Sequence, residues 1–405
     1  MKKVFVIGCG AAGMMAALMS SIKGNKVTIF EKNDRPGKKL LITGKGRCNV
    51  TNTATIKEFI ENTPTNGKFL YSALNRFSNS DLIEFLNKNG LMTKVERGGR
   101  VFPVSDRSKD VLDVFLKLIK ANGIDIHYNA RVTDILSDSS RVLGIVVNGK
   151  KEYCDSVILS TGGLSYPSTG STGDGYDMAR KLGHTIIDPY PALVPLVTAE
   201  DVSGMMGLSL KNINAKLYVN DKFIKEEFGE MLFTHFGLSG PVILTLSSYI
   251  KNINESNVVI KLDLKPALTY EKLNDRIQKD FKKYLKKEFK NSLNDLLPRS
   301  LTPYVIKQSG INPDKKVSEV SKLERNALVH ALKELVFHVI SKRPIKEAII
   351  TSGGVSTKEI NPKTMESRLI KGLFFAGEII DVDALTGGYN LQISFSTGYL
   401  AGINS

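Results

Sequence analysis

The 405-residue sequence has no tryptophan, only three cysteines and five histidines, and no long apolar run. Cys9, Cys48 and Cys154 are too few for a disulfide framework, and neither they nor the histidines show the spacing of a zinc site. The sequence therefore predicts no metal centre and no membrane span. With so few cysteines, a reducing compartment, the cytoplasm, is expected. The lack of tryptophan weakens any case for a base-stacking platform.

Acidic residues are also in short supply. There are 41 of them against 56 basic residues, which gives a net charge of +15. This balance favours an anionic partner, which can be a cofactor, a nucleic acid or a membrane surface, and does not choose among them. The 42% of hydrophobic and 24% of charged residues are ordinary for a globular chain of two or three domains. Collagenous and wholly disordered chains are thereby excluded.

The N-terminus fits two competing patterns. Residues 1–19 imitate a secretory signal, because a short basic region precedes an apolar run. A βαβ unit explains the same residues better. A buried strand at 4–7 leads directly into GCGAAG at 8–13, a helix follows at 14–22, and a second strand at 26–30 completes the unit. Cleavage of a leader would destroy that unit, so we expect the βαβ unit.

The glycines of this unit predict a phosphate site. Gly8 permits the tight turn, Gly10 lets the backbone approach a pyrophosphate, and Gly13 lets the helix pack closely on the strand. The helix N-terminus adds free N–H groups and the positive end of a dipole. Glu31 can accept hydrogen bonds from both ribose hydroxyls and would repel a 2′-phosphate, so the site favours FAD or NAD over NADP. The alternative is a helix-start turn without a ligand.

Three later segments favour FAD over NAD. The basic loop GKGRCN at 44–49 can line the pyrophosphate and the ribityl chain. Residues 161–163 follow a strand and can approach the cofactor from its other side. Residues 376–378 end a strand, and GGYNLQ at 387–392 opens a helix. The N–H groups of that helix would face the flavin N1–C2=O edge, where negative charge develops on reduction.

The order of elements predicts an α/β fold with a mostly parallel sheet, helices on both faces and a small antiparallel layer. Near residue 190 prolines and short alternating runs replace this pattern, which returns near 342. We expect an FAD-binding domain of residues 1–190 and 342–405, interrupted by an inserted domain of residues 191–341. Within the insert, residues 191–265 are expected to be β-rich and residues 266–341 helical.

A lysine-rich segment lies in the expected helical part. Residues 279–290 hold six lysines and two acidic residues. Phe281, Leu285 and Phe289 recur every four residues, which predicts an amphipathic helix with this stripe on the core and the lysines in solvent. The alternative is a docking surface for an acidic partner.

Seven stretches spread along the whole chain carry a family resemblance: GCGAAG at 8–13, TGKGRCNVTN at 43–52, GGRVFPVS at 98–105, STGGLSYPSTGSTGDGY at 160–176, FTHFGLSGP at 233–241, SGGVSTKEINPKTMESRLIKGLFFAGEIID at 352–381 and TGGYNLQISFSTG at 386–398. In these stretches the chain resembles the BaiN/RdsA group of NAD(P)/FAD-dependent oxidoreductases, the YhiN-like flavoproteins that are similar to aminoacetone oxidase. The resemblance implies a Rossmann-like FAD-binding domain of the two-dinucleotide-binding type, interrupted by a β-barrel-plus-helical insert. It does not fix the substrate, because the family includes members linked to amine oxidation and to reduction of steroid-like enones.

The resemblance also assigns cofactor contacts, motif by motif. It assigns the adenosine and pyrophosphate end to Gly8, Gly10, Gly13, Glu31, Lys32 and, through its backbone, Val132. Ala11, Ala12 and Lys39 are further expected cofactor contacts. It assigns the pyrophosphate and flavin region to Gly44, Arg47, Cys48, Asn49, Thr161, Gly162 and Gly163. It assigns the ribityl chain and flavin ring to Gly377, Glu378, Gly388, Asn390, Leu391 and Gln392. Lys45 stands where the family usually has glycine, a departure that we do not expect to alter binding.

Candidates for catalysis are few. His235 can act as an acid or base near pH 7, but a histidine that joins the insert to the FAD domain by hydrogen bonds is favoured. Arg100 can pair with a substrate carboxylate or form a structural salt bridge. Cys48 can be redox-active beside flavin, but a packed cysteine is favoured because no second cysteine lies near it in sequence. Residues 169–175 are expected to form a loop over the flavin, with a tight turn as the alternative.

The sequence therefore predicts an FAD-dependent oxidoreductase. A hydride would pass between the flavin N5 and a small organic substrate, NAD(P)H, or both, in a cleft between the domains. A second dinucleotide fingerprint is absent, which leaves the use of NAD(P)H open. Two alternatives are a flavoenzyme that acts on RNA, suggested by the charge, and a flavin-binding regulatory or interaction protein whose insert binds a partner. Nucleic acid is the less favoured partner because no basic motif is interleaved with aromatic residues, and the oligomeric state is left open.

Overall fold

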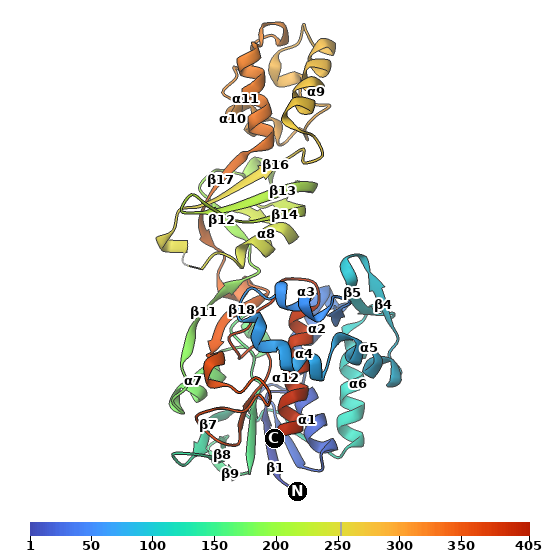
Figure 1. Ribbon diagram of the computed structural model, residues 1–405, viewed down its shortest axis with the longest axis vertical. Helices are drawn as coiled ribbons and strands as arrows, with labels where there is room; N and C mark the ends of the chain where they lie inside the picture. The colour runs from blue at the N-terminus through green and yellow to red at the C-terminus, as the bar shows by residue number, and fades with distance from the viewer. Residues whose placement is uncertain (252) are drawn as a thin grey trace. The chain divides into compact units, whose positions relative to one another are not determined.

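Both ends of the chain contribute to one unit of the structure, and the middle forms a second (Figure 1). The computed structural model describes residues 1–251 and 253–405. Unit 1 comprises Met1–Ala192 and Pro344–Ser405, and unit 2 comprises Leu193–Arg343. Each unit encloses a hydrophobic cluster of its own.

A five-stranded parallel sheet forms the centre of unit 1, in the order β19-β10-β1-β2-β6. The strands are β1 (Lys3–Ile7), β2 (Lys26–Phe30), β6 (Asp125–His127), β10 (Ser156–Leu159) and β19 (Leu373–Phe375). The central strands are continuous apolar runs, as a parallel sheet covered on both faces requires. β19 comes from the C-terminal segment and pairs with β10, so the Rossmann-like sheet predicted from the sequence is confirmed.

Helix α12 (Tyr389–Asn404) packs along α1 (Ala11–Ile22), and Figure 1 shows the two side by side. Small residues make this contact close. A Cβ added at Gly402 would lie 2.3 Å from the carbonyl oxygen of Ala16. The last helix of the chain is therefore fixed against the helix that follows the first glycine motif.

The other elements of unit 1 surround this core. Two small antiparallel sheets contain β7 (Val132–Ser137), β8 (Val142–Val147) and β9 (Lys150–Tyr153), and β3 (Thr51–Asn52), β5 (Arg100–Pro103) and β4 (Thr93–Glu96). A further antiparallel pair consists of β11 (Ile186–Ala192) and β18 (Ile350–Val355). The remaining α-helices are α2 (Lys38–Ile42), α3 (Ile56–Glu61), α4 (Tyr71–Arg76), α5 (Asn79–Lys88), α6 (Ser108–Ala121) and α7 (Asp174–Lys181).

Unit 2 is a closed β-barrel with helices, in agreement with the predicted insert. The barrel order is β12-β15-β14-β13-β16-β17, with strands β12 (Leu196–Thr198), β13 (Ser209–Val219), β14 (Lys222–Phe233), β15 (Gly237–Ser239), β16 (Val258–Asp263) and β17 (Leu335–Lys342). The helices are α8 (Pro241–Ser247), α9 (Tyr270–Lys283), α10 (Thr302–Ser309) and α11 (Lys322–Lys333). Barrel and helices share one apolar cluster. Over the described residues, no helix is both long and apolar enough to span a bilayer.

The end of the insert differs from the expected helix over residues 266–341. Its last residues belong to β17, which closes the barrel by pairing with β16 and β12. The buried side chains of Leu335, Phe337 and Val339 occupy alternate positions. Alternation with a period of two is typical of a half-buried strand, so this segment cannot continue the helical stripe.

The lysine-rich segment also differs from the amphipathic helix expected over residues 279–290. Helix α9 ends at Lys283, because the backbone of Tyr284 leaves the helical region. Phe281 and Phe289 are buried, with ring centroids 6.1 Å apart, but Phe289 belongs to the next segment and Leu285 is exposed. The apolar stripe is therefore built by a helix and a turn together.

Candidate cofactor site

The turn between β1 and α1 is shaped by glycines that allow close backbone contacts. Gly8 has a φ of +101°, and a Cβ added there would lie 2.7 Å from the carbonyl oxygen of Ser160. A Cβ added at Gly13 would lie 2.0 Å from the carbonyl oxygen of Gly8. A Cβ added at Gly10 would meet no described atom within 4 Å. Gly8 and Gly13 thus serve the fold, whereas Gly10 faces open space.

Helix α1 begins beside this open space without a side-chain cap. Gly10 is its N-cap, and the first helical hydrogen bond runs from the Met14 N–H to the Gly10 carbonyl oxygen at 2.9 Å. The N–H groups of the first turn, Ala11 to Gly13, therefore have no helical partner. Free N–H groups at a helix N-terminus, reached across a glycine, fit the pyrophosphate of a dinucleotide.

Glu31 directly follows β2, and its carboxylate is buried against backbone donors. The Cys9 N–H donates to Glu31 Oε2 at 2.9 Å, and the Asn33 N–H donates to Oε1 at 2.8 Å. The Ala130 N–H donates to the Glu31 carbonyl oxygen at 2.9 Å. This hydrogen bond holds the residues that precede β7 beside the end of β2. Val132, the first residue of β7, therefore lies near the residue predicted to bind ribose.

Lys32 and Asn33 hold the glycine-rich segment 169–175. Lys32 Nζ lies 3.0 Å from Asp174 Oδ2, and Asn33 Nδ2 donates to a backbone carbonyl of the segment at 3.2 Å. Burial raises the pKa of Asp174, but the hydrogen bond and charge of Lys32 outweigh burial and lower it. These contacts fix the segment at the Glu31 end of the site. The expected position of this segment over the flavin stays a prediction.

A charged cluster joins α2 to the strand-end motif at 376–378. Lys39 Nζ contacts the Glu378 carboxylate and donates to Ser165 Oγ at 2.7 Å. Ser165 Oγ and the Thr351 N–H donate to Glu378 Oε1 at 2.9 and 2.8 Å. Burial raises the pKa of Glu378, yet the charge of Lys39 and these hydrogen bonds hold it below its ordinary value. Glu378 is therefore an ionised anchor between distant parts of unit 1.

Two buried polar atoms of predicted cofactor residues, Asn49 Oδ1 and Thr161 Oγ1, have no hydrogen-bond partner in the described part of the chain. Leaving such a group unpaired costs about 1–3 kcal/mol. Thr161 follows β10, and a Cβ added at Gly388, the N-cap of α12, would lie 2.9 Å from Asn49 Oδ1. The unpaired atoms fit a polar ligand held between β10 and α12.

The N-terminus of α12 is the second uncapped helix start of the site. Asn390 does not cap the helix but supports the preceding turn, since its Oδ1 accepts from the Ala384 N–H at 2.9 Å and its Nδ2 donates to the Ala384 carbonyl at 2.7 Å. The Gln392 N–H donates to the Gly388 carbonyl oxygen at 3.2 Å. The N–H groups of Tyr389, Asn390 and Leu391 therefore have no helical partner.

The side chains of Gln392 and Cys48 are fully buried in the protein, and the cofactor contacts expected of these residues stay a prediction. Gln392 accepts from Thr51 Oγ1 at 2.6 Å and donates to Ser396 Oγ at 2.9 Å, so its amide joins α12 to β3. Burial raises the pKa of the Cys48 thiol to about 12. The thiolate is the reactive form, so this position favours the packed over the redox-active interpretation.

Arg47 and Arg100 meet at one acidic side chain. Arg47 donates to Glu96 and, through Nε at 2.9 Å, to Asp106, and its guanidinium lies 4.2 Å from the centroid of the Phe102 ring. Arg100 Nη2 lies 3.9 Å from Glu96. The hydrogen bond from Arg47 is the main cause that lowers the pKa of Glu96. The Arg47 side chain is thus held by protein carboxylates where a pyrophosphate contact was expected.

His235 lies in unit 2, between β14 and β15. Its side chain is exposed and its ring centroid lies 4.9 Å from that of Phe236. A catalytic role for His235 stays a prediction. Among the described residues, no group of three or more His, Cys, Asp or Glu side chains is arranged to hold a metal ion.

Sequence analysis missed Ser165 and Thr351. Thr351 Oγ1 accepts from the N–H groups of Leu164 and Ser165 at 2.8 and 3.0 Å, and a Cβ added at Gly163 would lie 2.5 Å from it. The signals available were weak: Ser165 stands inside the motif at 160–176, and Thr351 directly precedes the motif at 352–381.

The chain matches a known family over nearly its whole length. A family described as the HI0933-like protein Rossmann domain matches residues 2–404. The chain is 31% identical over 410 residues to the 3-dehydro-bile acid delta(4,6)-reductase of Clostridium scindens, covering 99% of this chain and 98% of that protein. It is also 31% identical over 404 residues to a ribosomal RNA dihydrouridine synthase of Haemophilus influenzae, covering 98% and 97%.

Two solved structures have a fold similar to that of this chain. The open conformation of a flavocytochrome c3 fumarate reductase has a TM-score of 0.52 at 18% identity, covering 100% of this chain and 78% of that one. The 3-ketosteroid delta1-dehydrogenase of Sterolibacterium denitrificans has a TM-score of 0.53 at 13% identity, covering 99% and 98%. At these identities the likeness concerns the fold alone.

Proposed function

The chain belongs to the HI0933-like Rossmann-domain family and is an FAD-dependent oxidoreductase, and from this premise we propose that it reduces a carbon–carbon double bond conjugated to a carbonyl group. The reaction takes up one hydride and one proton for each double bond. NAD(P)H is the proposed transient source of the hydride.

The names of two relatives support this reaction type. A delta(4,6)-reductase of a 3-dehydro compound saturates double bonds conjugated to a ring ketone. A dihydrouridine synthase saturates the uracil ring bond conjugated to a carbonyl. The two substrates differ in size and charge, but the bond that accepts hydrogen is of the same kind.

The structural observation that supports FAD binding, on which the proposal depends, is the pair of uncapped helix starts in unit 1, α1 and α12, whose helices pack together beside the unpaired Asn49 and Thr161 atoms. FAD, when bound, supplies hydride transfer at its ring. Gly10 and the first turn of α1 would hold its pyrophosphate, and Glu31 its ribose. The free N–H groups of α12 would stabilise negative charge on the ring.

A second candidate is the same reduction carried out on RNA. Relatives from Haemophilus influenzae and Escherichia coli, 31% and 28% identical over nearly the whole chain, are named ribosomal RNA dihydrouridine synthases. The net charge of +15 favours an anionic substrate. The substrate of the first candidate function is a small enone, whereas the substrate of the second is a uracil base within an RNA strand.

Anaerobic spectroscopy of the FAD-loaded protein tests the proposal. We expect NADH or NADPH to bleach the flavin band, and we expect a conjugated enone or a uracil-containing transcript to restore it. A saturated analogue of each acceptor is the control, because it offers no double bond. A protein that binds no FAD, or a reduced flavin that neither acceptor reoxidises, would contradict the proposal.

A further inference from the structure

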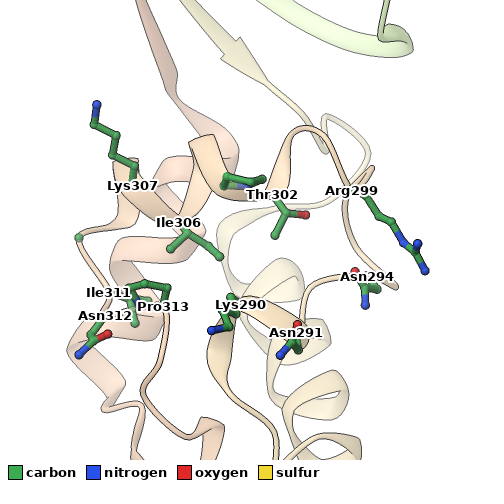
Figure 2. A pocket seen from close by; sticks show the side chains of 12 residues that line it. Lys290, Asn291, Asn294, Arg299, Thr302, Ile306, Lys307, Ile311, Asn312 and Pro313 are labelled. Atoms are coloured by element: carbon green, nitrogen blue, oxygen red, sulfur yellow. The ribbon is translucent and has the colours of Figure 1, made fainter. Parts of the chain in front are cut away.

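A pocket of about 800 Å³ lies in the helical part of unit 2 (Figure 2). It is formed by the turn at Phe289–Asn291, the following loop, α10 and the loop after α10. Its polar lining residues are Lys290, Asn291, Asn294, Arg299, Thr302, Lys307 and Asn312. The function proposed above uses none of them.

The charged and amide side chains that line the pocket are cations and carboxamides, and no carboxylate lines it in the part of the chain that the structure describes. Lys290 is already compensated, since its Nζ lies 2.6 Å from Asp314 and 3.0 Å from Glu288, both outside the lining. Arg299 and Lys307 are exposed and form no ion pair with any residue that the structure describes. Two uncompensated positive charges are thus available to an anion.

The floor of the pocket is apolar. Ile306 and Ile311 are buried and line the pocket between its polar residues. Figure 2 shows Arg299 and Asn294 on one side of Ile306, and Lys307 and Asn312 on the other. A flat base can cover an apolar floor of this kind, and carboxamides match base edges because they both donate and accept hydrogen bonds.

The charge around the pocket extends beyond the pocket itself. Residues 279–316 contain ten basic and four acidic residues, a local net charge of +6. A mononucleotide would occupy the pocket and leave most of this charge unmatched, whereas a strand would follow it with successive phosphates.

We propose that this pocket binds one nucleotide of a single-stranded polynucleotide, with Arg299 and Lys307 on its phosphates and the asparagines at its base. RNA and single-stranded DNA share this chemistry. The proposal concerns binding and does not rest on the proposed reduction, so it can fail while the reductase activity stands, and the reverse.

Fluorescence anisotropy with the FAD-loaded full chain tests the proposal. The probes are labelled single strands of RNA and DNA, about 12 nucleotides long. The test variant is Arg299→Ala with Lys307→Ala. The matched control is Lys211→Ala with Lys222→Ala, which removes two exposed barrel lysines of unit 2 that form no ion pair within residues 1–251 and 253–405.

The test variant should bind roughly 25-fold more weakly at ~0.1 M salt, because each phosphate contact contributes about 0.7 to the salt slope of a single strand. Its salt slope should fall by about 1.4. Asn291→Ala with Asn294→Ala should weaken binding by about fivefold and leave the slope unchanged, because it removes hydrogen bonds and no charge. Thermal melting and flavin content verify that each variant is folded.

Several outcomes would overturn the proposal. The test variant could bind like the wild type, the barrel control could lose as much affinity, or uridine monophosphate could compete fully at equal nucleotide concentration. The first two outcomes would show that this pocket does not account for binding, and the third would show that a strand is not needed. Tighter binding of RNA than of DNA would support the proposal and identify RNA as the preferred polynucleotide. Equal binding would support the proposal for both polynucleotides.

Discussion

Gly398 of α12 lies directly against Ala12 of α1: a Cβ added at Gly398 would be 2.4 Å from the Ala12 carbonyl oxygen. That oxygen belongs to the first turn of α1, whose N–H groups face the open side of the glycine turn. The contact therefore sets where the two uncapped helix starts stand relative to each other.

Replacing Gly398 with alanine should separate α12 from α1. Because the obstacle is backbone, the helices must shift, and we expect a loss of about 1–3 kcal/mol in the free energy of unfolding together with weaker FAD binding. Chemical denaturation and flavin titration measure the two effects. Gly204→Ala is the control, since its new Cβ meets no described atom within 4 Å. Normal FAD affinity in Gly398→Ala would contradict the role given to this contact.

Gly10 and Gly13 should give opposite results when each is changed to alanine. The new Cβ at Gly10 enters open space, so the apoprotein should lose no more than about 1 kcal/mol, the scale of an N-cap change, while FAD binding falls tenfold or more. The new Cβ at Gly13 lies 2.0 Å from the Gly8 carbonyl, so that variant should be unstable even without FAD. Thermal melting of the apoprotein and FAD titration test both. Unchanged FAD affinity in Gly10→Ala would exclude this turn as the pyrophosphate site.

Lys39→Met should destabilise unit 1 by about 2 kcal/mol, because it leaves the Glu378 carboxylate partly buried without its cation. Lys38→Met is the matched control. Lys38 pairs with the exposed Asp34 at 2.8 Å, so its loss should leave stability nearly unchanged. Urea denaturation at neutral pH compares the two variants, and equal stabilities would contradict the anchoring role of Glu378.

The pair of Lys39 and Glu378 also predicts how the stability of the folded protein depends on pH. The folded-state pKa of Glu378 lies below its ordinary value of 4.5, so its ionised form stabilises the folded protein. This contribution is fully present above the unfolded pKa and is lost as the pH falls through the lowered folded value. Lys39→Met should make stability depend less steeply on pH below about 4.5. An unchanged slope in a urea series at acidic pH would sink this prediction.

Cys48→Ala should retain flavin reduction by its electron donor. The thiol is fully buried with its pKa raised to about 12, so it holds no reactive thiolate at neutral pH. Burial also raises the pKa of Cys154 to about 12. A thiol-reactive chromophore should therefore find no rapidly reacting cysteine in the native protein. A loss of turnover with normal flavin content would restore the redox interpretation of Cys48.

Local patterns were sufficient to predict the first βαβ unit. The strand, the glycine turn, α1 and Glu31 all lie within 31 residues, and each follows from composition or spacing over a few positions. The parallel sheet and the barrel insert both agree with the predictions made from the sequence. The prediction that the insert contains a barrel came from the family resemblance.

Partners distant in sequence could not be predicted in the same way. Arg47 meets Glu96 and Asp106, which lie 49 and 59 positions away, and these carboxylates hold the guanidinium that was assigned to the cofactor. β17 was missed because its alternation is only eight residues long and directly follows the lysine-rich helices. Tertiary packing decides which distant residues become partners. It leaves no repeating pattern of residues in the local sequence that could predict them.

The return of the chain to unit 1 after Arg343 has a consequence for biosynthesis. β19 and α12 leave the ribosome after every strand of the barrel, yet β19 extends the central sheet and α12 supplies one of the two helix starts. Unit 2 can therefore fold while translation continues, whereas the proposed FAD site is complete only after α12 has been synthesised.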